Sequence, residues 1–183
     1  NVRIEGKDET LSGRGEYSTT LVLRRLAAWL DCPCPAKSAR PVETDLPGRP
    51  PNLCPGCSHR AVYYAVRQVF GDDAVYSSDI GCYTLGWLAP LHAIDTCVDM
   101  GASITMAKGA ADAGQHPSVA VIGDSTFTHS GMTGLLDAVN ERADITVIIS
   151  DNLTTGMTGG QDSAGTGRLE QICAGIGVDP AHI

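Results

Sequence analysis

The chain lacks the features that mark membrane and nucleic-acid-binding proteins. None of its apolar runs approaches the roughly 20 residues of a membrane-spanning helix, and the longest, 119–123 and 145–149, have the length of a strand. Its 13 Lys and Arg residues are scattered among 21 Asp and Glu, for a formal net charge of −8. Because a phosphate backbone is bound by clustered basic residues, this composition argues against a nucleic-acid partner.

Signals for secretion and for a disulfide framework are also missing. The start of the chain has no signal-peptide pattern and no initial Met, which predicts an internal piece of a longer polypeptide. The chain has seven Cys, and an odd number without a secretion signal argues against paired disulfides. We therefore expect a cytoplasmic enzyme whose thiols bind a metal ion or a cluster.

Two segments that are present, 119–125 and 145–152, predict neighbouring strands. Each is a run of β-branched and aliphatic residues that ends in a carboxylate or an amide, and a helical pattern over 131–142 separates them. Such a unit closes as a right-handed parallel crossover, so Asp124 and Asn152 should lie side by side at the carboxyl edge of the sheet. Their oxygens can hold Mg²⁺, and the cation can hold a diphosphate.

The rest of the pattern predicts an α/β layer fold with a mainly parallel sheet, because strands alternate with helices. Residues 1–48 are expected to form a helix within 16–30 and a proline-rich interdomain linker. The domain that follows, 49–183, is expected to be truncated at its C-terminal end. Its further predicted elements are a helix over 59–70, a strand over 74–78, a turn at 81–82, a helix over 101–113, a helix over about 167–175 and a strand that starts at Val178.

Two other segments have both a functional and an ordinary interpretation. Gly123-Asp124-Ser125 begins a candidate metal site, but Gly-Asp after a strand is also a common turn. The Gly- and Thr-rich segment 155–161 can cradle a phosphate through its backbone N–H groups, or it can be a flexible surface loop. Asp79, just before Gly81-Cys82, is expected to accept N–H groups of that turn.

The thiols allow several interpretations. Cys54 and Cys57 form a Cys-x-x-Cys pair, and Cys82 ends another predicted strand. A redox pair, a zinc site and an iron–sulfur cluster all use such thiols. A cluster needs a fourth thiolate, for which Cys97 and Cys173 are candidates, although Cys173 lies on an apolar helical face that is typical of a buried free Cys.

Several motifs together resemble 2-oxoacid:ferredoxin oxidoreductases, most closely the α subunits of the indolepyruvate enzymes. Gly123-Asp124 and Asn152 also resemble the diphosphate–magnesium motif of thiamine diphosphate enzymes. That motif is usually Gly-Asp-Gly followed by an Asn, so Ser125 replaces its second Gly. The resemblance covers residues 50–183. The matching segments are 53–60, 79–86, 100–104, 122–131 and 157–159.

The resemblance implies a three-layer thiamine diphosphate-binding fold with helices on both faces of the sheet, and it implies a set of site residues. Asp124, Asn152 and Thr154 are the implied Mg²⁺ ligands. The implied cofactor-binding residues are Gly81, Cys82, Gly123, Asp124, Ser125, Asn152, Thr154, Met157, Thr158 and Gly159. The thiols that match the 4Fe–4S ligands of the family are Cys54, Cys57 and Cys82. No catalytic residue is assigned; His59 and His129 are candidates, although a His at a helix start is more often structural.

The implied activity is oxidative decarboxylation of a 2-oxoacid, such as an aryl pyruvate, to an acyl-CoA with reduction of ferredoxin. The implied partners are the 2-oxoacid, coenzyme A, ferredoxin and other domains or subunits, in an oligomer, with the activating Glu on a separate domain. These residues alone are then expected to be inactive. Two alternatives remain open: a non-oxidative thiamine diphosphate-dependent decarboxylase, and a non-enzymatic module in which Cys54 and Cys57 bind structural zinc.

Overall fold

The structure, a computed structural model, describes residues 6, 11, 17–34, 48 and 50–183. It divides into two compact units, Asn1–Gly48 and Arg49–Ile183, which are treated separately below. Most of the proline-rich segment that was predicted as a linker, 35–47, lies outside the described residues. Among the helices described, none has the length and apolarity needed to cross a bilayer.

In the first unit, α1 spans Thr19–Trp29, which confirms the helix predicted within 16–30. Ser18 caps its start, because Ser18 Oγ accepts a hydrogen bond from the Leu21 N–H at 3.2 Å. A serine at this position satisfies one of the free N–H groups of the first turn. Ala27 is buried, whereas Leu23 and Leu26 of the apolar face are exposed.

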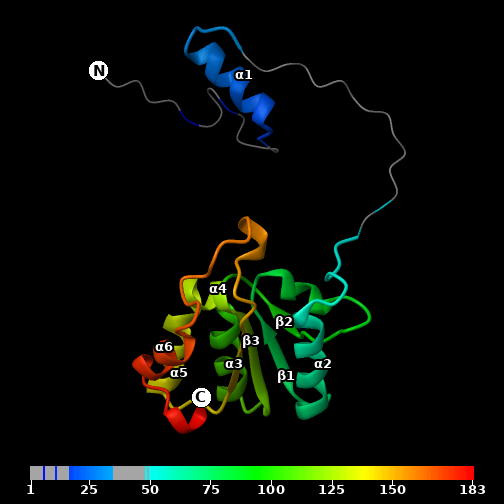
Figure 1. Ribbon diagram of the computed structural model, residues 1–183, viewed down its shortest axis with the longest axis vertical. Helices are drawn as coiled ribbons and strands as arrows, with labels where there is room; N and C mark the ends of the chain where they lie inside the picture. The colour runs from blue at the N-terminus through cyan, green and yellow to red at the C-terminus, as the bar shows by residue number, and fades with distance from the viewer. Residues whose placement is uncertain (1–5, 7–10, 12–16, 35–47, 49) are drawn as a thin grey trace. The chain divides into compact units, whose positions relative to one another are not determined.

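The second unit is built on a parallel sheet of four strands in the order β2-β1-β3-β4 (Figure 1). The strands are β1 (Val75–Ser78), β2 (Thr96–Cys97), β3 (Ser118–Gly123) and β4 (Thr146–Ser150). The helices are α2 (Ser58–Phe70), α3 (Ala102–Asp112), α4 (Asp124–Thr126), α5 (Met132–Asn140) and α6 (Leu169–Ile176). In the register, Ser78 pairs with Val121 and Gly123 with Ser150, so the carboxyl ends of β1, β3 and β4 lie at one edge.

Two apolar clusters cover the two faces of this sheet. Alternate residues of β3 point to opposite faces, and all of them are buried. Val121 packs with Tyr63 of α2 in one cluster, while Ile122 packs with Ile104 of α3 and Leu135 of α5 in the other. A fully buried side chain of this size contributes about 1.5–3 kcal/mol. Figure 1 shows α2 on one side of the sheet and α3, α5 and α6 on the other, which confirms the predicted three-layer fold.

The crossover between β3 and β4 begins earlier than predicted. The sequence placed its helix over 131–142, but α4 begins at Asp124 and continues through a π-helical turn, Phe127–Gly131, into α5. A carboxylate in the first helical turn is favoured by the partial positive charge of the free N–H groups there. The Gly-Asp-Ser segment therefore marks a direct change from strand to helix, with Asp124 as the first helical residue.

The end of the chain and one short strand also differ from the prediction. Val178 does not begin a strand, because its N–H donates to the Cys173 carbonyl at 3.1 Å and Gly177, with φ 111°, closes α6 in a left-handed conformation. A short 3₁₀ helix, Pro180–His182, follows. Conversely, β2 was not predicted, because two residues give no periodic pattern.

Asp79 ties the end of β1 to the start of α3. Its carboxylate is fully buried and accepts backbone N–H bonds from Ile80 at 3.0 Å, Gly101 at 2.6 Å and Ser103 at 2.9 Å. The bond to Ile80 confirms that Asp79 serves the turn after β1. The other two bonds satisfy N–H groups at the start of α3, where negative charge is favourable.

Replacing Asp79 by Asn should lower the free energy of unfolding by about 2–4 kcal/mol, because an amide has one acceptor oxygen and no charge for the three N–H donors. Urea denaturation of the complete natural polypeptide, followed by circular dichroism, measures this. Asp112→Asn is the matched control, since Asp112 forms an exposed pair with Lys108 that contributes at most about 1 kcal/mol. Equal losses in both variants would contradict the role given to Asp79.

Candidate functional site

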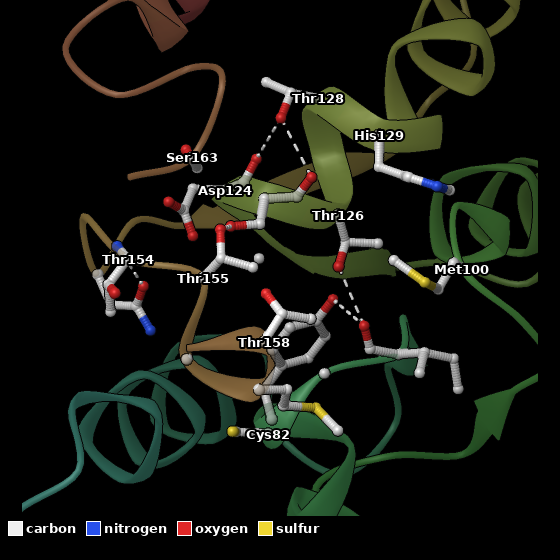
Figure 2. Close-up of a pocket in the computed structure, with 18 of the residues that line it drawn as sticks. Cys82, Met100, Asp124, Thr126, Thr128, His129, Thr154, Thr155, Thr158 and Ser163 are labelled. Atoms are coloured by element: carbon white, nitrogen blue, oxygen red, sulfur yellow. Dashed lines mark hydrogen bonds between the residues drawn. The ribbon is translucent and has the colours of Figure 1, made fainter. Parts of the chain in front are cut away.

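A cavity of about 620 Å³ lies at the carboxyl edge of the sheet. Residues from the ends of β1, β3 and β4 line it, together with the start of α2 and the loop after β4. Figure 2 shows the labelled side chains arranged around a common hollow. Ligands of parallel α/β sheets bind at this edge, because there the loops and helix starts present polar groups.

Nearly all the cofactor-binding residues predicted from the sequence line this cavity. They are Gly81, Cys82, Gly123, Asp124, Ser125, Asn152, Thr154, Met157 and Thr158. Gly159 belongs to the same loop but is not among the lining residues. The two candidate histidines, His59 and His129, also line the cavity. The structure therefore brings together residues that lie far apart in the sequence.

The cavity also includes polar side chains that were not predicted as site groups: Thr126, Thr128, Ser163 and Thr155, whose segment was considered only for its backbone N–H groups. Thr126 directly follows the Gly-Asp-Ser segment and Thr155 begins the Gly-rich loop, so their neighbours in sequence could have indicated them. Ser163 and Thr128 carry no such signal. Ser163 lies in the loop before α6 and Thr128 lies in the π-helical turn, and only the fold brings both to the cavity.

Two glycines let the ends of β1 and β3 approach the ring of Tyr83. A Cβ atom on Gly123 would lie 2.7 Å from Tyr83 Cε1, and a Cβ on Gly81 would also collide with that ring. Tyr83 is buried, and its hydroxyl donates to the Ile80 carbonyl at 3.2 Å. Burial raises the pKa of Tyr83 to about 12, so the phenol keeps its proton and this bond at neutral pH.

Asp124 is the most unusual group of the cavity. Only 2% of its surface is exposed, and its Oδ2 is buried without a hydrogen-bond partner. A buried carboxylate oxygen is costly unless a donor or a cation satisfies it. Asn152 and Thr154 line the same cavity, and Asn152 Oδ1, which accepts the Thr154 N–H at 3.1 Å, keeps a second lone pair. A carboxylate, an amide oxygen and a backbone carbonyl are the donors that Mg²⁺ prefers, so these residues fit the cation.

His59 forms one wall of the cavity and is held in place by hydrogen bonding and packing. It is 4% exposed, its Nδ1 lies 3.0 Å from Ser150 Oγ, and its ring meets Tyr83 edge to face at 5.4 Å. Burial lowers the pKa of His59, and the negative charge of Asp124 only partly opposes this. The ring is therefore neutral near pH 7. His129, in contrast, is exposed at the rim.

The thiols are not assembled into one metal site. Cys82 lines the cavity, whereas Cys54 and Cys57, at the start of α2, do not. In the described part of the chain, no three His, Cys, Asp or Glu side chains are grouped so that they could hold a metal ion. Cys173 is buried in the cluster formed with α5, whereas Cys97 packs against the cluster on the other face. The implied iron–sulfur ligand set is thus not formed here.

The comparison with known families agrees with this geometry. Residues 79–181 match the family described as thiamine pyrophosphate enzyme, C-terminal TPP-binding domain. The chain belongs to this family. The matched range includes the carboxyl edge of the sheet and the Gly-rich loop, and therefore most of the residues that line the cavity.

Curated relatives extend the similarity to most of the chain. The chain is 47% identical over 146 residues to indolepyruvate oxidoreductase subunit IorA of Archaeoglobus fulgidus, which covers 73% of this chain and 23% of the relative. It is 35% identical over 209 aligned positions to the subunit of the same name from Pyrococcus abyssi, which covers 98% of this chain and 32% of the relative. The chain therefore spans less than a third of the length of these relatives.

A solved structure supports the fold of the thiamine diphosphate-binding domain. The 2-oxoglutarate:ferredoxin oxidoreductase from Magnetococcus marinus, solved with 2-oxoglutarate, coenzyme A and succinyl-CoA bound, matches with a TM-score of 0.50 and 22% identity. The match covers 63% of this chain and 42% of that one. At this level of identity, the similarity concerns the arrangement of the sheet and helices.

Gly123→Ala should destabilise the thiamine diphosphate-binding domain by about 1–3 kcal/mol, because its new methyl group would overlap the buried Tyr83 ring. Chemical denaturation measures the loss. Gly109→Ala is the control, because Gly109 lies in α3 with open space around its Cα and alanine favours a helix. An unchanged stability of Gly123→Ala would show that the strand ends do not depend on this close approach.

His59 should titrate below the ordinary value of 6.5, as followed by the NMR signals of its ring. Since the pKa is lower in the folded than in the unfolded state, His59 stabilises the fold above pH 6.5, and this contribution is lost as the pH falls below that value. The decrease in stability between pH 7.5 and pH 5 should therefore be smaller in His59→Gln. His182→Gln, at an exposed position, should keep the full decrease. A His59 pKa at or above 6.5 would contradict its burial.

Proposed function

We propose that this domain binds the diphosphate of thiamine diphosphate through Mg²⁺ in the cavity, as part of a 2-oxoacid:ferredoxin oxidoreductase that decarboxylates an aryl pyruvate oxidatively. The observation that supports this most strongly is the buried carboxylate of Asp124, a residue that lines the cavity and whose Oδ2 has no hydrogen-bond partner. A cation at this position would satisfy that oxygen. The names of the relatives, indolepyruvate oxidoreductase subunits, favour the substrate class.

Each group of residues has a defined role in this proposal. Asp124, the Asn152 side chain and the Thr154 carbonyl hold Mg²⁺, which fixes the diphosphate. The remaining contacts come from the residues that line the cavity around them: Gly81, Cys82, Gly123, Ser125, Met157 and Thr158. When bound, thiamine diphosphate supplies the carbon nucleophile and the electron sink for decarboxylation. The protein contributes binding, orientation and exclusion of water, with the neutral His59 as a wall group.

The substrates and partners of the complete enzyme extend beyond this domain. We propose that coenzyme A takes the acyl group, that ferredoxin takes the electrons, and that further domains or subunits complete the site. The implied iron–sulfur ligands of this domain are Cys54, Cys57 and Cys82, which are not grouped into a metal site in the described part of the chain. We therefore assign no step to a cluster within this domain, and the iron content of the protein is part of the test.

The experiment is titration calorimetry of thiamine diphosphate with Mg²⁺, on the complete polypeptide purified without oxygen. We expect one cofactor per chain, and we expect Asp124→Asn to weaken binding at least roughly a hundredfold, because the cation loses its charged ligand. Asp151→Asn is the matched control. Asp151 is the carboxylate beside Asn152; it is exposed and lines a different cavity, and Asn keeps the oxygen that accepts the Leu153 N–H.

Elemental analysis of the same samples separates the alternatives. Iron together with thiamine diphosphate supports the ferredoxin oxidoreductase. Thiamine diphosphate without iron favours a non-oxidative decarboxylase. Zinc without thiamine diphosphate would contradict the proposed enzyme and leave a structural metal module at Cys54 and Cys57.

A further inference from the structure

Ser125 makes a contact that the usual motif residue cannot make. Its Oγ lies 2.8 Å from Thr155 Oγ1, across thirty positions of sequence. Both residues are only partly exposed and both line the cavity. A glycine, which stands here in the usual Gly-Asp-Gly motif, has no side chain to form this bond. The hydroxyl therefore gives this chain a link between α4 and the Gly-rich loop.

The loop that contains Thr155 is closed by hydrogen bonds between its own two ends. The Thr155 N–H donates to the Gln161 carbonyl at 2.7 Å, and the Gly160 N–H donates to the Thr155 carbonyl at 3.0 Å. Thr155 and Gln161 form an antiparallel bridge. Gly159 and Gly160 have φ values of 127° and 78°, which glycine adopts without strain. Because the two ends of the loop Thr155–Gln161 are hydrogen-bonded to each other, a contact that fixes Thr155 also restrains the rest of the loop.

Helix α4, which carries Ser125, is held in place by hydrogen bonds of its own. Ser125 is in α4, and the Thr128 hydroxyl donates to the carbonyls of Ser125 at 3.1 Å and Asp124 at 3.3 Å. Thr126 Oγ1 donates to the Ile80 carbonyl at 3.0 Å, which ties α4 to the turn after β1. The Ser125 hydroxyl therefore links the loop to the same element that carries Asp124.

The two hydroxyls also leave a donor free. Ser125 and Thr155 each have one O–H group, and the bond between them uses one of the two protons, whichever residue donates. The remaining O–H needs an acceptor, and both side chains lie at the cavity. An anionic phosphate oxygen is a strong acceptor for a hydroxyl donor.

We propose that Ser125 and Thr155 form a hydroxyl latch that fixes the loop Thr155–Gln161 to the Asp124 turn and leaves one O–H for an oxygen of the cofactor diphosphate. The second half rests on the proposed function, whereas the latch itself does not. Both are positioning residues: they set the position of the loop and the affinity for the cofactor, and they take no part in the chemical steps.

The latch is tested first without cofactor, by hydrogen exchange of the amides of 155–161 in the complete polypeptide. Ser125→Ala should speed exchange in this loop roughly two- to tenfold, the effect of losing one hydrogen bond. Ser125→Thr keeps the hydroxyl and should restore slow exchange. Thr96→Val is the matched control: it removes a similar hydroxyl pair, Thr96 with Ser77 at 3.0 Å, away from the cavity, and should leave the loop unchanged.

The cofactor arm uses a double-mutant cycle. Ser125→Ala and Thr155→Val should each raise the Kd for thiamine diphosphate with Mg²⁺ roughly two- to tenfold. The double variant should be no worse than the more affected single variant, because that single change already removes both the bond between the hydroxyls and the donor to the diphosphate. Ser125→Thr should bind the cofactor as the unsubstituted protein does.

The two arms separate failure of this inference from failure of the proposed function. Unchanged exchange in Ser125→Ala overturns the latch, even if the unsubstituted protein binds thiamine diphosphate. Additive losses of affinity in the double variant overturn the shared role of the two hydroxyls in cofactor binding. If the unsubstituted protein binds no thiamine diphosphate, the proposed function fails and the diphosphate contact falls with it, while faster loop exchange in Ser125→Ala still supports the latch.

Discussion

Burial of carboxylates at the ends of two adjacent strands is the constraint on which the rest of the structure depends. A charged group removed from water must find donors or a cation. Asp79, at the end of β1, finds three backbone N–H groups and so joins the sheet to α3. Asp124, directly after β3, is almost as deeply buried but has an unpartnered oxygen. The first carboxylate is therefore fully satisfied by the protein, whereas the second keeps an oxygen that can accept a donor or a cation.

The ends of β1 and β3 can lie close together because two glycines there have no side chains. Gly81 and Gly123 leave room for the Tyr83 ring between the ends of β1 and β3. The buried hydroxyl of Tyr83 and the neutral His59 complete this wall through bonds to Ile80 and Ser150. Packing and hydrogen bonding at the wall of the cavity therefore depend on the same few residues, and a change in any of them should affect stability as well as the proposed cofactor binding.

The sequence predicted the α/β layers and the convergence of Asp124 with Asn152, because long buried strands and parallel crossovers leave strong periodic signals. It did not predict β2, which is too short for a pattern, or the early start of the crossover helix at Asp124. Val178 was assigned to a strand because its apolar character does not reveal that its N–H closes α6. Thr128 and Ser163 enter the site through tertiary structure alone, so local sequence could not identify them. The grouping of Cys54, Cys57 and Cys82, implied by a resemblance, was not found.

The most direct test of the central claim is anomalous diffraction from crystals of the complete polypeptide grown with thiamine diphosphate and Mn²⁺ in place of Mg²⁺. Data collected at the manganese edge locate the cation without reference to any assumed mechanism. We expect one peak within bonding distance, about 2.1 Å, of the Asp124 carboxylate, with the diphosphate on its other side. A cation bound elsewhere, with Asp124 hydrogen-bonded only to protein groups, would contradict this expectation.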